Sequence, residues 1–298
     1  MSAATVRKQI KESEQAIKEV MQIGLSIIGE TIVDKVMRNA RNSTPSTLLS
    51  SIKGVTPSGV NQYKKDLINS MAIVSSEAIK QARKEVPKAA RVKMQESNDL
   101  DGSIQFANIK SGTLDTVLFD NLPVGTRKRI KSAADLLVDT QIADLEKSIF
   151  FQFNSSAVAT DSMSQLEYEI SQSALDYVEG PSVAAGASVT AANVVNESRN
   201  AFFLTEDVLE EIEAFEFVNG DPVTQICTSL DGTVFAKNDP DMFKYTGPLH
   251  YGCKSTMMPI LNGNLKGREI TKLQSKYDDQ IQFSEIETAC RECSRHFN

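Results

Sequence analysis

Apolar residues recur at spacings of three and four along most of residues 3–203, which is the period of an amphipathic α-helix. The first stripe predicts a long helix over about residues 3–41, with a bend or break near Gly24 and an end before Pro45. This stripe consists of Val6, Ile10, Ile17, Met21, Leu25, Ile28, Ile32 and Val36. We expect its side chains to form one buried face.

Later stretches carry the same period and predict further helices. We place these helices over about residues 60–85, 126–150, 162–178 and 190–203. Asn, Asp, Gly and Ser replace the periodic pattern between residues 95 and 125, which predicts loops and a hinge. The small residues of Gly180–Ser188 predict a turn-rich segment that opens a second domain.

The period changes after residue 203. Residues 206–216 are rich in Glu and predict an acidic helix, whereas Ala214–Val218 alternates apolar and polar residues as a half-buried strand does. Residues 233–235 and 254–261 are further strand candidates. A last helix is predicted over about residues 271–297.

These patterns predict a predominantly α-helical α+β fold in two parts. Residues 1–180 are expected to form long helices that carry assembly contacts, with the hinge at about 95–125. Residues 181–298 are expected to form a smaller α+β domain of short strands and turns with a terminal helix. The low aromatic content, 6% with no Trp, favours helices over a β-sandwich.

Charge and hydropathy limit the function classes. A net charge of −7 argues against a protein whose whole surface neutralises nucleic acid. Basic patches at residues 80–93 and 127–131 are expected to be solvated helix faces, with non-specific contact to DNA as the alternative. No apolar run approaches the ~18 residues of a membrane span, and the first residues lack a secretory signal core, so we expect no membrane association and synthesis in the cytoplasm.

All cysteine and histidine lies in the last quarter of the chain. The 4 Cys and 2 His fall between Cys227 and His296. Within this region Leu230-Asp-Gly232 predicts a tight turn between two extended segments, with Gly232 at positive φ and the Asp side chain bonded to its own backbone. His250 and Cys253 follow a Gly-Pro turn and are two metal-ligand types three residues apart.

These motifs resemble the phage Mu F-like and SPP1-type minor head protein family over about residues 190–262. The resemblance is carried by Phe215-Glu-Phe-Val218, Asp221, Cys227–Gly232, Pro248–Lys254 and Pro259. It implies a portal-associated structural protein of a tailed bacteriophage, made in the host cytoplasm and located in the virion, in the head interior or at the portal vertex. The implied role is head morphogenesis, DNA packaging or DNA delivery. The implied partners are the portal protein, packaged DNA bound non-specifically, and the major capsid or scaffold protein.

The chain departs from the family pattern at the cysteines. Thr224 and Ser255 stand where family members carry the outer thiols of two pairs. The remaining candidate metal ligands are Cys227, His250, Cys253, Cys290 and Cys293. They could form a zinc site, a metal-free remnant held by packing or hydrogen bonds, or a disulfide. The joint loss of two thiols favours the metal-free remnant, so no cofactor is predicted and zinc stays the alternative.

Two other function classes compete with the structural role. A Cys/His-dependent enzyme would need an activated nucleophile, yet Cys227 follows Thr-Gln-Ile without a Gly-rich elbow, and no phosphate-binding loop occurs. An independent DNA-binding module is disfavoured by the acidic segment after Thr205. Glu197 and Arg199 are expected to form a structural salt link or an interaction site. The sequence therefore favours a protein that is not an enzyme.

Overall fold

The computed structural model describes residues 3–40, 59–86, 119–120, 122, 124–159, 162–220, 225–239 and 254–271. The described elements are α1 (Ala3–Ala40), α3 (Val60–Arg83), α6 (Val124–Ala159), α7 (Met163–Glu179), α8 (Pro181–Phe203), α9 (Glu206–Glu210), β1 (Ile212–Val218), α10 (Gln225–Leu230), β2 (Val234–Ala236) and β3 (Thr256–Leu261). Long helices with one small sheet confirm the predicted, predominantly helical α+β class.

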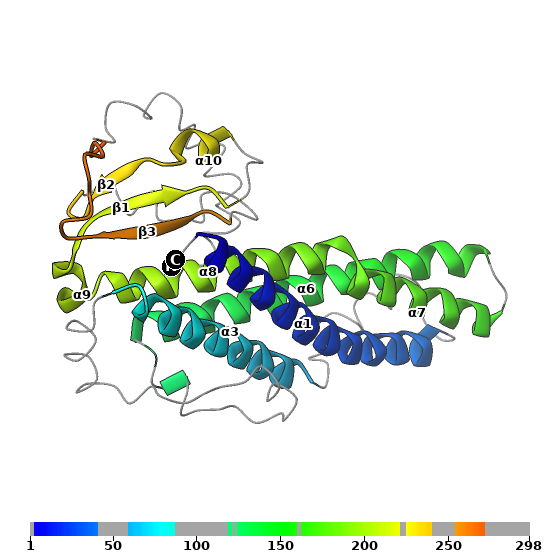
Figure 1. Ribbon diagram of the computed structural model, residues 1–298. Helices are drawn as coiled ribbons and strands as arrows, with labels where there is room; N and C mark the ends of the chain where they lie inside the picture. Colours follow the sequence, from blue (N-terminus) through cyan, green and yellow to red (C-terminus); the bar gives the residue numbers. More distant parts are fainter. Residues whose placement is uncertain are drawn as a thin grey trace.

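The long helices form an elongated bundle, and the sheet lies at one end of it (Figure 1). α8 packs against α1 and α3, and α6 packs against α7. β3 is the strand nearest to α8, whereas α7 and the end of α6 lie at the opposite end of the bundle (Figure 1). No helix in these ranges has both the length and the apolar composition needed to cross a bilayer.

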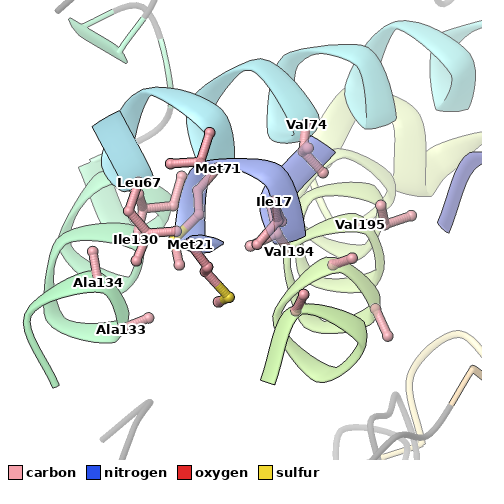
Figure 2. Packing of buried hydrophobic residues seen from close by; sticks show 14 of the residues in the cluster. Ile17, Met21, Leu67, Met71, Val74, Ile130, Ala133, Ala134, Val194 and Val195 are labelled. Atoms are coloured by element: carbon pink, nitrogen blue, oxygen red, sulfur yellow. The ribbon is translucent and has the colours of Figure 1, made fainter. Parts of the chain in front are cut away.

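The apolar stripe predicted for the first helix is the centre of the core. All eight of its residues, from Val6 to Val36, are buried. Figure 2 shows Ile17 and Met21 of α1 converging with Leu67 of α3, Ile130 of α6 and Val194 of α8. Each such side chain stabilises the fold by about 1.5–3 kcal/mol when fully removed from water.

The predicted break at Gly24 is wrong, because α1 is one uninterrupted helix. The glycine instead lets Tyr63 of α3 approach: a Cβ at position 24 would lie 2.2 Å from the ring Cδ2. The Tyr63 hydroxyl donates to Gln141 Oε1 at 2.5 Å. Burial raises the pKa of this phenol, so it stays protonated and keeps donating.

The segment predicted as turn-rich, Gly180–Ser188, is also corrected. It is the first part of α8, which begins at Pro181 with Gly180 as the N-cap. Proline fits the first helical turn, and the alanines that follow are strong helix formers. The small residues of this segment pack in the core instead of forming turns, since Val183 and Ala187 are fully buried.

The division into two domains stays a prediction. α8 follows the predicted boundary at residue 180, yet it shares one hydrophobic core with α1 and α3. The predicted hinge at 95–125 and the predicted last helix, 271–297, fall almost wholly outside the described residues.

The sheet has three antiparallel strands in the order β2-β1-β3. Phe215 lies opposite Phe235 of β2 and Pro259 of β3, and proline suits an edge strand such as β3 because it has no N–H to donate. The strands predicted near 214–218, 233–235 and 254–261 are confirmed. The acidic helix predicted over 206–216 is too long, since α9 ends at Glu210 and β1 begins at Ile212.

Candidate functional site

The Leu-Asp-Gly turn connects α10 to β2. The predicted extended segment before the turn is instead the short helix α10, whereas the predicted positive φ of Gly232 is confirmed at 75°. Asp231 does not bond its own backbone. Its Oδ1 accepts from the Asn219 N–H at 2.8 Å, which fastens the turn to the end of β1.

Cys227 is the only predicted metal ligand among the described residues. It is fully buried on α10, within the same hydrophobic core as Leu230 and Phe235. His250, Cys253, Cys290 and Cys293 lie outside the described residues. Within the described ranges, no three His, Cys, Asp or Glu side chains are grouped as metal ligands. Its side chain contributes to the packing of this core.

Ser255 is the centre of a hydrogen-bond network. Its hydroxyl donates to Asn219 Oδ1 and accepts from the Gly220 N–H, both at 3.4 Å. Its carbonyl accepts from Asn196 Nδ2 of α8 at 2.9 Å. A neutral hydroxyl is a poor zinc ligand compared with a thiolate, so the residue present here suits hydrogen bonding better than metal binding.

We expect protein purified without chelator to contain no stoichiometric zinc. Replacing the buried thiol by Cys227→Ala should then lower stability by about 1 kcal/mol, the size expected for a small buried side chain. Elemental analysis together with thermal unfolding checks both statements. About one zinc per chain, lost together with stability in Cys227→Ser, would show that a metal site persists.

A buried ion pair joins α8 to the end of α3. Arg199 donates from Nη1 to Glu85 Oε1 at 2.6 Å and from Nη2 to Glu85 Oε2 at 3.1 Å. The exposed fractions of the two side chains are 0% and 3%. This two-fork geometry is the strong form of a charge-assisted bond. It confirms the predicted structural salt link of Arg199 and supplies the partner, Glu85, that sequence reasoning missed.

Arg199 also contacts the sheet and the end of its own helix. Its Nη2 lies 3.6 Å from Met258 Sδ on β3. Its guanidinium carbon lies 5.3 Å from the centre of the Phe203 ring, within the range of a cation–π contact. One side chain therefore connects α8, the residue after α3 and the sheet.

Glu197, which the sequence analysis named together with Arg199, faces α6. Its Oε2 lies 3.7 Å from Arg129 Nη1. Burial raises the pKa of Glu197, and the Arg129 guanidinium opposes that shift only in part. This pair is a second structural link between helices.

Two further bonds tie the N-terminal half of α1 to the ends of the strands. Arg7 Nη2 donates to the Asn219 carbonyl at 2.8 Å. Lys254 Nζ lies 3.5 Å from Glu14 Oε2. Asn219 and Lys254 are thus bonded to α1, and the neighbouring Ser255 is bonded to α8.

A shallow groove of about 430 Å³ lies beside the buried ion pair. Its lining includes Glu85, Glu216, Arg268 and the β3 residues Met258 and Ile260. Arg268 Nη1 donates to Glu216 Oε2 at 2.7 Å, so each carboxylate in the groove is held by an arginine. These polar groups are engaged in holding the sheet and its following segment in place.

The geometry is that of a junction between sheet and bundle, built by Arg199, Ser255 and their hydrogen-bond partners. Comparisons of the chain with protein-family models, with curated proteins and with solved structures found no match.

Proposed function

We propose that this chain is a minor head protein of a tailed bacteriophage, a structural component of the virion bound at the portal vertex. It would act in head morphogenesis, DNA packaging or DNA delivery. The portal protein is its main partner, with packaged DNA and the major capsid or scaffold protein as further contacts. The proposal carries the family resemblance of residues 190–262 over to this chain.

The observation that supports this proposal best is that the residues of the motif have structural roles. Cys227 lies in the core, Asp231 holds the end of β1, and Ser255 bonds β1 to α8. A motif whose side chains fasten a small sheet to a helical bundle suits an assembly protein, since such a protein must present a fixed surface to its neighbours.

The alternative of a Cys/His-dependent enzyme has less support. A catalytic thiol must be reached by its substrate and needs a surrounding that favours the thiolate. The Cys227 thiol is fully buried among apolar side chains, where a substrate cannot reach it. A nucleophilic role for this residue would require the core to open.

The proposal is tested on particles and on the isolated proteins. We expect the chain to remain with gradient-purified virions at low copy number and to bind purified portal protein. Deleting its gene should reduce the yield of infectious, filled particles. Normal particles from the deletion strain, together with no binding to the portal, would refute the proposal.

A further inference from the structure

The outward side of α7 exposes two large apolar side chains in register. Tyr168 is 64% exposed and Leu175 is 44% exposed. They are seven residues apart, so they lie on the same side of the helix, about 10 Å apart along its axis. Single exposed apolar residues are common, but an aligned pair on one helix side offers a continuous contact strip.

The same helix is acidic and has no Lys or Arg. Glu167, Asp176 and Glu179 are exposed around the apolar pair. The carboxylate of Glu169 is engaged differently, because it accepts hydrogen bonds from Ser156 of α6 and from Gln165. The exposed strip therefore carries a negative rim.

Tyr168 and Leu175 take no part in the hydrophobic core of the described residues. The opposite side buries Leu166, Ile170, Ala174 and Val178 in the bundle core. α7 also lies at the far end from the sheet, where the α6–α7 pair forms the end of the bundle (Figure 1). Its neighbour α6 exposes another aromatic side chain, Phe151, at 73%. The aligned residues are thus placed for contact with another molecule.

We propose that Tyr168 and Leu175, with the rim of Glu167, Asp176 and Glu179, form a docking face for a partner protein. The partner presents an apolar pocket bordered by Lys and Arg. This inference rests on the proposed function, under which the partner is the portal protein.

Charge selects this partner over other occupants. A second copy meeting the first through the same face would place like carboxylates together, which costs free energy in a desolvated interface. Nucleic acid and anionic lipid are repelled for the same reason. A basic protein surface is attracted by the acidic rim as it approaches. Its apolar pocket then removes the exposed side chains of Tyr168 and Leu175 from water.

The docking face is tested by a double variant, Tyr168→Ser with Leu175→Ser. We expect its affinity for purified portal protein to fall at least about tenfold, because aromatic and apolar anchors carry most of the binding free energy of an interface. The melting temperature should stay unchanged, since both side chains are exposed. The matched control is Ile23→Ser with Ile27→Ser, which removes two exposed apolar residues of α1 and should leave binding intact.

The acidic rim is tested separately in the triple variant Glu167→Gln, Asp176→Asn and Glu179→Gln. Its affinity for portal should fall about threefold or more at low salt, and its salt dependence should become shallower.

The outcomes separate the two proposals. If the wild type binds portal protein and the double and triple variants bind it equally well, the docking face is overturned and the portal role stands. Absence of binding by the wild type contradicts the portal role and this inference together. Self-association that the double variant abolishes would identify a second copy as the occupant and overturn the inference.

Discussion

Gly24→Ala is expected to destabilise the protein by about 3 kcal/mol, the upper part of the range for overpacking a core. The added Cβ would lie 2.2 Å from Tyr63 Cδ2 and 2.5 Å from its Cγ. These are atoms near the base of a ring that is 2% exposed and whose hydroxyl is bonded to Gln141. The ring therefore has no room to turn away, and α1 and α3 must separate. Denaturant-induced unfolding followed by circular dichroism measures the loss.

Gly29→Ala is the matched control on the same helix. Its Cβ would lie 3.5 Å from the Ala174 Cβ, an ordinary van der Waals contact. This variant should stabilise the protein by about 0.5–1 kcal/mol, because alanine is the better helix former. Equal effects of the two substitutions would mean that Tyr63 does not sit against Gly24. Tyr63→Leu in the Gly24→Ala background should recover part of the lost stability.

The long helices were predictable because their burial follows the period of the sequence. Every apolar residue assigned to the stripe of α1 is buried, and the start of α3 at Val60 agrees with prediction. Such a stripe encodes which side of a helix is covered. It does not encode which helix covers it, so the sequence indicates a special role for Gly24 but not that Tyr63 packs against it.

Composition misled the prediction where small residues serve packing. Gly180–Ser188 has the composition of a loop, yet from Pro181 it forms the first turns of α8. The distinguishing signal was present: a proline after Gly180 is typical of a helix start, and alanines follow it. Small residues of α8 also pack in the core, since Ala187, Ala191 and Ala192 are fully buried.

The candidate site was predicted less well than the fold because it depends on distant residues. Arg199 was identified as one half of a salt link, but Glu85 lies 114 positions earlier in the chain. No local pattern connects the two. Ser255 likewise bonds Asn196 and Asn219, each from another element. The spacing of residues within a motif predicts a local turn, as at Gly232. Hydrogen-bond partners that are distant in the sequence can be identified only from the folded structure.

The second large effect is expected at the buried ion pair. Arg199→Met should cost about 3–5 kcal/mol, because it removes the arginine that pairs with a carboxylate that is 3% exposed. Glu85→Gln should also be strongly destabilising, since it leaves the guanidinium buried without a counter-charge. Thermal and denaturant unfolding measure both variants.

The combination of the two changes tests whether the charges act as a pair. Replacing both residues by apolar ones, Arg199→Met with Glu85→Leu, should cost clearly less than the sum of the single losses, because neither charge is then left unpaired. The exposed pair Arg38–Asp34 on α1 is the control: its side chains are 78% and 66% exposed, and Arg38→Met should change stability by less than about 0.5 kcal/mol. Strict additivity at the buried pair would show that Arg199 and Glu85 contribute independently. The pair also bears on the sheet, because the same guanidinium contacts Met258 of β3, beside the bond from Asn196 of α8 to the Ser255 carbonyl.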